Sequence, residues 1–309
     1  MRHSILCGDA EEMLSGLPSR SVQCILTSPP YYKQRDYGAE GQIGMESSGD
    51  RYIARLSGVL SECHRVLRDD GVLWLNCGDA YEDGQLLGIP WRLALAAKAV
   101  GWLVRQEVIW AKKTPMPSAS RGRCTLSHEP LFMLTKKASG YFYDSVAIEE
   151  PAAHGGTKNR RSVWNLGSTP YSGSHFATMP TTLAELCLLS GASQHGKCGV
   201  CGSPWSRMIE KIKLTRFRPN EFVKRTGEAG TGNSCGNSVA GVSTRTVGWK
   251  PTCECNSSEV EPCIVLDPFV GSGTTIAVAD RLGLTGIGIE INPDYVAMAR
   301  QRVAKSTTG

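Results

Sequence analysis

A glycine turn between a predicted strand and a predicted helix restricts the fold of this chain more than any other feature. The apolar run 263–266 leads into Asp267-Pro-Phe-Val-Gly271-Ser-Gly273, and a helical pattern covers 274–282. Glycines permit a tight turn and let the backbone approach a ligand at the helix N-terminus. Glu290 follows Gly273 by 17 positions, at the end of the next apolar run. That is close to the ~20-residue spacing at which an acid holds ribose hydroxyls. The series predicts a nucleotide-type ligand, with an ordinary βα turn as the alternative. A Walker P-loop is excluded, because no Gly-Lys-Ser/Thr ends the turn.

The rest of the chain divides into an α/β pattern and an irregular middle. Short apolar runs alternate with helical patterns over residues 1–112 and again over 262–309, which predicts a largely parallel sheet built from both ends of the chain. Residues 113–174 are rich in Ser, Thr, Gly, Pro and basic residues and predict a loop-rich region. A segment at 175–189 and an insertion at 190–261, rich in Gly, Ser, Thr and Cys, complete the expected divisions.

Several classes of protein are excluded by composition. A hydrophobic content of 41% with 20% charged residues fits a globular chain with a core. The apolar stretch 86–100 is broken by Pro90, Arg92 and Lys98, so no run reaches the ~20 apolar residues of a membrane span. The N-terminus lacks the apolar segment of a signal peptide, and no repeat of a solenoid is found. We therefore expect a cytoplasmic, non-membrane protein.

A second motif, Thr27-Ser-Pro-Pro-Tyr-Tyr32, follows the predicted strand 22–26. The carboxyl end of a strand is where ligands bind in α/β sheets. Two consecutive prolines remove two backbone donors and fix the backbone torsions, which leaves rigid carbonyl acceptors beside an aromatic ring. The motif predicts a site that grips an amino group and stacks a planar ring. A simple Pro-Pro turn with exposed tyrosines is the alternative.

Four of the 12 cysteines form two close pairs, Cys198-Gly-Val-Cys201 and Cys253-Glu-Cys255. Four thiolates in tetrahedral arrangement bind zinc strongly, and a metal orders a segment that lacks an apolar core. The second pair is CxC rather than CxxC, so Cys235 or His195 can replace one ligand. Unrelated cysteines are the alternative.

Basic residues are concentrated in the same insertion. The net charge of the chain is +5, but residues 197–250 hold ten Lys or Arg against three acidic residues. A local basic excess suits a polyanion, and a solvated surface explains it equally well.

Together the two motifs resemble the DNA amino-methyltransferases that use S-adenosylmethionine. The turn Asp267–Gly273 matches the cofactor motif of that family, and Ser28-Pro-Pro-Tyr31 matches its catalytic motif. The catalytic motif comes first, which is the permuted beta order. Gly8-Asp9, residues 175–180 and residues 288–292 also match cofactor-pocket segments, and the resemblance covers 1–189 and 262–309.

The resemblance implies a Rossmann-like S-adenosylmethionine-dependent methyltransferase fold with a mainly parallel sheet, a loop-rich recognition region and a small zinc-binding insertion. It implies the two halves of the core at 1–112 and 262–309, target recognition at 113–174 and the cofactor pocket segment at 175–189. The implied catalytic residues are Ser28, Pro29, Pro30 and Tyr31. The implied cofactor-binding residues are Asp9, His175, Pro180, Asp267, Phe269, Gly271, Gly273, Thr274, Glu290 and Asn292.

The implied activity is methyl transfer from S-adenosylmethionine to an exocyclic amine of double-stranded DNA. The target base must leave the helix to reach the pocket. Serine at the first position of the catalytic motif resembles the cytosine-N4 enzymes, whereas aspartate is more typical of the adenine-N6 enzymes. We therefore expect cytosine N4, with adenine N6 as the alternative.

DNA contacts are expected mainly from the region 113–174, because Arg and Lys read guanine edges or hold phosphates. The expected DNA-contacting residues are Tyr32, Arg121, Arg123, Lys158, Arg160 and Arg161. The compartment implied is the cytoplasm of a bacterial or phage-infected cell. A cognate restriction endonuclease, the recognition sequence, the oligomeric state and DNA contact by the zinc insertion stay open.

Two further functions compete with this hypothesis. One is a non-catalytic, zinc-containing DNA-binding protein with a degenerate methyltransferase core, against which the intact motifs argue. The other is an RNA or small-molecule methyltransferase, against which the basic insertion and the catalytic motif argue.

Overall fold

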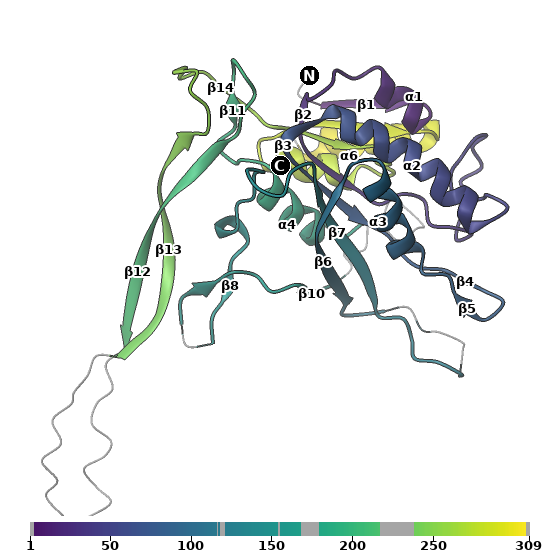
Figure 1. Ribbon diagram of the computed structural model, residues 1–309, viewed down its shortest axis with the longest axis horizontal. Helices are drawn as coiled ribbons and strands as arrows, with labels where there is room; N and C mark the ends of the chain where they lie inside the picture. Colours follow the sequence, from purple (N-terminus) through teal and green to yellow (C-terminus); the bar gives the residue numbers. More distant parts are fainter. Residues whose placement is uncertain are drawn as a thin grey trace, which may run out of the picture.

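The computed structural model describes residues 3–115, 117, 121–153, 155–167, 179–216 and 238–306. An eight-stranded sheet with the order β1-β16-β15-β2-β3-β7-β6-β10 forms the body of the protein (Figure 1). Strand β7 is antiparallel to both its neighbours, and every other neighbouring pair in this sheet is parallel. The strands are β1 (His3–Cys7), β2 (Val22–Thr27), β3 (Leu67–Asn76), β6 (Leu103–Lys112), β7 (His128–Thr135), β10 (Val163–Leu166), β15 (Ile264–Asp267) and β16 (Thr285–Glu290). The predicted α/β fold with a mainly parallel sheet is confirmed.

Both ends of the chain build the centre of the sheet. Strand β15 lies between β16 and β2, with Val265 opposite Cys24, and β16 pairs with β1 at the edge. All six residues of β2 are buried, as expected for a parallel strand covered on both faces. The motifs at 27–32 and 267–273 therefore follow two strands that are hydrogen-bonded neighbours.

Helices cover both faces of the sheet. One face carries α1 (Ala10–Ser15), α2 (Gly49–Val66) and α3 (Ile89–Ala99). The other carries α4 (Thr181–Gly191) and α5 (Thr274–Arg281), and α6 (Pro293–Ser306) packs beside α5. Alternate residues of β3 serve the two layers: Leu73 and Leu75 join the first core, and Val72 and Trp74 join the second. Within these residue ranges, no helix combines the length and the apolar character needed to cross a membrane.

The region expected to be loop-rich, 113–174, supplies two strands of the sheet. Strand β7 pairs with β3 and β6 through its apolar residues 131–134, and β10 pairs with β6 at the far edge. The same region holds a short 3-10 helix (Val146–Ile148) and the hairpin β8 (Glu150–Pro151) and β9 (Thr157–Lys158). The expectation of a loop-rich region is therefore wrong for residues 128–135 and 163–166, which are strands of the sheet, and the assignment of 113–174 to target recognition stays a prediction.

The insertion at 190–261 contains a long two-stranded ribbon that points away from the body (Figure 1). Strand β12 (Trp205–Arg216) pairs antiparallel with β13 (Ser238–Pro251). At its root, β11 (Lys197–Cys198) pairs with β14 (Val260–Glu261). A small hairpin of β4 (Tyr81–Glu82) and β5 (Gln85–Leu86) projects on the other side of the body.

Candidate active site and cysteine cluster

The two sequence motifs line one cavity. A cavity of about 410 Å³ lies at the carboxyl ends of β2 and β15, and a smaller one of about 80 Å³ adjoins it. The larger is a suitable size for a small-molecule ligand. Ser28, Tyr37, Phe269 and Gly271 line both cavities. The structure thus brings the predicted catalytic and cofactor motifs to one place.

The glycine turn has the backbone geometry that its sequence predicts. Gly271 and Gly273 have φ angles of 49° and 87°, in the left-handed region that favours glycine. A Cβ on Gly273 would lie 2.9 Å from the Ala299 Cα, so α6 can pack this closely only against glycine. Gly273 is the N-cap residue of α5, which directs the first backbone N–H groups of that helix toward the cavity.

Asp267 holds the turn in place from beneath the cavity. The residue is 3% exposed, and its carboxylate accepts hydrogen bonds from Thr27 Oγ1 (3.0 Å), Thr275 Oγ1 (2.6 Å) and Phe269 N (3.0 Å). Burial raises the pKa of Asp267 to about 6, although the hydrogen bonds act in the opposite direction. Because Thr27 directly precedes the catalytic motif, this carboxylate ties the two motifs to each other.

Glu290 plays a similar part on the other side of the turn. Its two carboxylate oxygens accept from Gly271 N (3.0 Å) and Asn292 N (2.9 Å), and burial raises its pKa. Asn292 in turn donates to the Tyr37 carbonyl (2.9 Å). Glu290 and Asp9 both line the smaller cavity. Each carboxylate oxygen of Glu290 keeps a lone pair with which it can accept from a ligand hydroxyl.

The remaining predicted cofactor residues are placed in different ways. Asp9 caps α1 through Glu11 N (2.9 Å) and lies 3.5 Å from Arg55. Thr274 lines the larger cavity. Pro180 is buried at the start of α4, and its neighbour Met179 lines the cavity instead. His175 lies outside the described residues.

A chain of hydrogen bonds runs from the catalytic motif to a buried acid. Ser28 Oγ donates to the Tyr31 hydroxyl (3.2 Å), which donates to Glu129 Oε2 (2.7 Å). Burial first, and then the charge of Glu129, raise the pKa of Tyr31 well above its ordinary value. The Tyr31 ring lies against Gly78, where an added Cβ would come within 2.5 Å of it.

Glu129 was not predicted from the sequence, nor were the residues that hold it. It is 8% exposed at the start of β7, forms an ion pair with Lys112 at the end of β6 and accepts from Asn76 Nδ2 (3.2 Å). All three line the larger cavity. Asn76 is a polar residue at the end of an apolar strand, and this position could have indicated a site residue. The sequence gives no such indication for Glu129, because it reaches Tyr31 only through the antiparallel pairing of β7 with β3.

The expectation that Tyr32 contacts DNA is wrong in this structure. Tyr32 is 1% exposed, and its ring packs 5.5 Å from the ring of Tyr52. The Tyr52 hydroxyl donates to the Pro30 carbonyl (2.8 Å), which holds the Pro-Pro backbone against α2. Adjacent residues of the motif therefore point to opposite sides, Tyr31 to the cavity and Tyr32 to the core.

Most of the basic residues expected to contact DNA have partners within the chain. Lys158 and Arg161 both pair with Glu150, at 3.4 and 2.6 Å, and Arg160 Nε donates to the Ile148 carbonyl (2.7 Å). The Arg123 guanidinium lies 3.6 Å from the centre of the Tyr81 ring, and Arg121 is exposed. Their contact with DNA stays a prediction.

The four paired cysteines converge as their spacing predicts. The sulfur atoms of Cys198, Cys201, Cys253 and Cys255 lie within 4.8 Å of one another. Tetrahedral zinc with ~2.3 Å bonds separates its sulfur ligands by about 3.8 Å, so the set fits such an ion. His195 is not part of this group: it packs against the rings of Trp205 and Trp249. Cys235 lies outside the described residues.

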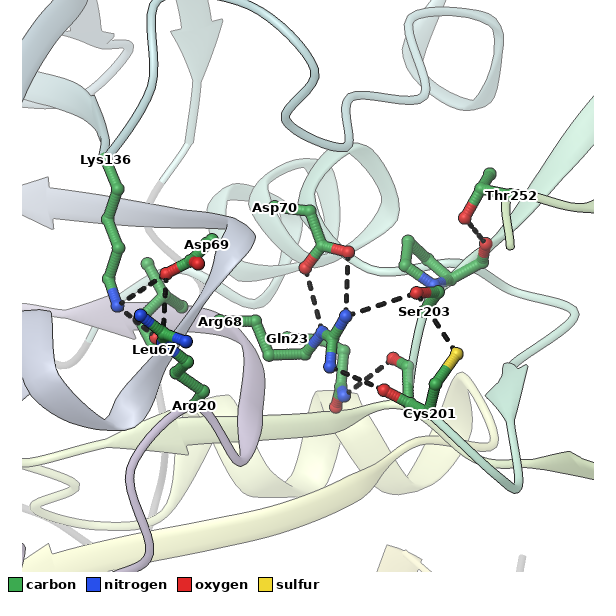
Figure 2. Close-up of polar contacts among 12 residues, drawn as sticks. Arg20, Gln23, Leu67, Arg68, Asp69, Asp70, Lys136, Cys201, Ser203 and Thr252 are labelled. Carbon is green, nitrogen blue, oxygen red and sulfur yellow. Dashed lines mark hydrogen bonds and ion pairs between the residues drawn. The ribbon is translucent and has the colours of Figure 1, made fainter. Parts of the chain in front are cut away.

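An arginine of β3 fastens the cysteine cluster to the sheet (Figure 2). Arg68 pairs with Asp70 (2.8 Å) and donates to the Cys201 carbonyl (2.8 Å) and Ser203 Oγ (3.2 Å). Gln23, near the start of β2, donates to the Gly202 carbonyl (3.2 Å). The cluster therefore sits at the amino-terminal edge of β2 and β3, opposite the cavity.

Comparisons with known proteins agree with this arrangement. The sequence pattern of the DNA methylase family, which covers N6 and N4 enzymes, matches residues 22–197 and 256–301. The type II methyltransferase M.Cfr9I of Citrobacter freundii is 35% identical over 97% of this chain and 87% of its own.

Two solved structures share the fold. The cytosine-N4-specific PvuII DNA methyltransferase has a TM-score of 0.63 at 17% identity, covering 99% of this chain and 90% of its own. A putative DNA modification methylase from Thermus thermophilus, solved with S-adenosyl-L-methionine, has a TM-score of 0.57 at 20% identity, covering 99% and 97%.

The fold and the paired motifs define an S-adenosylmethionine-dependent methyltransferase that acts on amino groups. The chain belongs to the N6/N4 DNA methylase family, whose members methylate exocyclic amines of DNA bases.

Proposed function

We propose that this protein transfers a methyl group from S-adenosylmethionine to the N4 amine of cytosine in double-stranded DNA. The hydrogen-bonded chain Ser28–Tyr31–Glu129, at a cavity shared with the glycine turn, carries the proposal. Serine in the first position of the motif favours cytosine N4 over adenine N6. The cytosine-N4 specificity of the PvuII enzyme, a structural neighbour, supports the same choice.

The chain's own residues suit an amine substrate. An exocyclic amine is conjugated to its ring and is therefore a poor nucleophile. A hydrogen-bond acceptor that faces its N–H favours the geometry in which the nitrogen lone pair leaves the ring and can attack. Ser28 Oγ is suited to this task because its own hydrogen points to Tyr31, which leaves its lone pairs for the target amine.

The Glu129 carboxylate, at the end of this series of hydrogen bonds, can accept the proton that the amine loses. The amine nitrogen loses one proton when it forms its bond to a methyl carbon. Ser28, Tyr31 and Glu129 form an unbroken line of donors and acceptors that ends in a carboxylate, and Lys112 and Asn76 hold that carboxylate in position.

Cofactor binding falls to the turn and the smaller cavity. Glu290 would hold the ribose, and Phe269, Gly271 and Thr274 would line the rest of the site. S-adenosylmethionine bound there supplies the electrophilic methyl group. Because Ser28 and Gly271 line the same cavity, the target base and the cofactor would meet at the catalytic motif.

A substrate with blocked amines tests the choice of base. DNA amplified with N4-methyl-dCTP in place of dCTP should take up little labelled methyl, whereas DNA amplified with N6-methyl-dATP should be labelled like ordinary DNA. The reverse pattern would assign the protein to adenine. Equal labelling of RNA of the same sequence would contradict a DNA substrate.

We also propose that the cysteine cluster holds one structural zinc ion. Thiolate coordination organises segments that lack an apolar core, and the fit of the four sulfurs supports it. We expect about one zinc per chain in the purified protein by metal analysis. Cys201→Ser should lose the metal and become sensitive to protease within 190–261, while the α/β body stays folded.

Cys124→Ser is the matched control, because Cys124 is an exposed cysteine outside the cluster. It should keep both its zinc and its protease resistance. A wild-type protein without metal, or a Cys201→Ser protein that behaves like the control, would show that the cluster is not a structural metal site.

A further inference from the structure

The β12–β13 ribbon is an addition to the family's core. The family pattern omits residues 198–255, which contain the ribbon and all four clustered cysteines. At about 3.3 Å per residue, the 12 residues of β12 span roughly 40 Å. A lone two-stranded hairpin is marginally stable in water, so its position depends on what holds it to the body.

A buried ion pair holds the root of the ribbon. Arg207 of β12 pairs with Asp144 (2.9 Å), and the two side chains are 13% and 5% exposed. The same guanidinium donates to Gln194 (2.6 Å) and lies 4.4 Å from the centre of the Trp249 ring. Charge-assisted bonds in this geometry set the direction in which the ribbon leaves the body.

A second attachment holds the middle of the ribbon. Val242 of β13 forms a β-bridge with Gly156, and Thr244 Oγ1 donates to Glu149 (3.0 Å). A Cβ on Gly241 would lie 2.0 Å from the Gly155 carbonyl oxygen, so the backbones meet at glycines. With the cysteine cluster docked on Arg68, the ribbon is attached to the body at three places.

Two lysines lie on one face of this fixed ribbon. Lys211 and Lys213 are two residues apart in β12 and therefore point to the same face. Both are exposed, and no ion pair is found for either among the residues that the structure describes. Their opposite residues across the ribbon, Thr244 and Val242, are uncharged.

Two acidic residues near these lysines, in the part of the chain that the structure describes, are bonded to other groups. Glu210 points to the other face and pairs with Arg245 (2.6 Å). Glu149 of the body accepts from the hydroxyls of Thr244 and Thr157. The face of Lys211 and Lys213 is also the face of Thr244, which turns toward the body.

We propose that the ribbon is a DNA-binding arm in which Lys211 and Lys213 contact backbone phosphates of the substrate duplex. The proposal rests on the proposed function only for the identity of the substrate. A polyanion is the partner that an unpaired basic face on a rigid arm fits, and a two-stranded ribbon is narrow enough to follow a DNA groove. Phosphate contacts position a protein on DNA without reading its sequence, so the arm adds affinity rather than specificity.

The test uses the full-length protein with Lys211→Ala/Lys213→Ala. Lys98→Ala/Lys137→Ala is the matched control, because these lysines are also exposed and lie at the amino-terminal edge of the parallel strands. The Kd for a duplex is measured by fluorescence anisotropy over a series of salt concentrations. Each phosphate contact contributes about 0.9 to the salt slope, so the ribbon variant should lose about 2 from it.

We expect the ribbon variant to bind DNA roughly tenfold more weakly or worse at about 0.1 M salt, with kcat at saturating DNA and the Kd of S-adenosylmethionine within about twofold of wild type. The control variant should keep the wild-type salt slope.

A ribbon variant with the salt slope and Kd of the control, while wild type still methylates DNA, would overturn the proposal that the ribbon binds DNA. It would leave the proposed function unaffected. A wild type that neither binds nor methylates DNA would overturn both. A change in oligomeric state without a change in DNA affinity would assign the ribbon to self-association and also overturn the arm.

Discussion

Ser28→Ala is expected to lower the single-turnover rate of methyl transfer by about a hundredfold or more, with the Kd of S-adenosylmethionine within about twofold of wild type. The reason is that Ser28 Oγ is the acceptor aimed at the target amine, whereas the glycine turn that binds cofactor is a separate segment. Tyr31→Ala should lose at least as much, because it removes both the ring beside the base and the link to Glu129.

Two further variants separate the parts of this effect. Tyr31→Phe keeps the ring but breaks the line from Ser28 to Glu129, so its rate should fall between those of wild type and Tyr31→Ala. Ser57→Ala removes a hydroxyl from α2 that donates only to the Ile53 carbonyl, and it should behave as wild type. Near-normal rates in both Ser28→Ala and Tyr31→Ala would refute the catalytic assignment.

Loss of the Glu290 carboxylate is expected to weaken S-adenosylmethionine binding by roughly ten- to hundredfold in calorimetric titration. A hydrogen bond to a charged group is worth about 1.5–3 kcal/mol, and Glu290→Ala removes the acceptor for Gly271 N and Asn292 N as well as that for the ribose. Glu290→Gln should bind better than Glu290→Ala, because one carbonyl oxygen remains.

Asp267→Ala should also weaken S-adenosylmethionine binding, because it changes the shape of the glycine turn. It leaves Thr27, Thr275 and Phe269 N without their shared acceptor. Asp267→Asn retains one oxygen acceptor and should bind cofactor better than Asp267→Ala. Unchanged affinity in both alanine variants would contradict the assignment of the cavity to S-adenosylmethionine.

The features that the sequence predicted well are local ones. The glycine turn and the cysteine pairs are short contiguous motifs, and the spacing of their residues predicts which of them lie close together. A motif at the end of a strand also predicts which edge of the sheet it occupies, so the meeting of Ser28 with Gly271 followed from two strands alone.

The features that were missed depend on pairing between distant segments. Glu129 reaches Tyr31 only because β7 turns back antiparallel beside β3, with Asn76 opposite Leu131. A short apolar run after Pro130 resembles a loop as much as a strand, which is why β7 was not expected. The expectation that Tyr32 contacts DNA is wrong for a different reason. Tyr32 is buried by packing against Tyr52 of α2, and the motif alone does not predict this contact.

The identity of the methylated nucleoside decides whether this protein is a cytosine-N4 methyltransferase. DNA incubated with the protein and S-adenosylmethionine carrying a labelled methyl group is digested to nucleosides and separated by mass spectrometry, with Ser28→Ala as the inactive control. We predict labelled N4-methyl-deoxycytidine from wild type and almost none from Ser28→Ala. Labelled N6-methyl-deoxyadenosine in its place, or no labelled nucleoside from wild type, would contradict methylation of cytosine N4 by this protein.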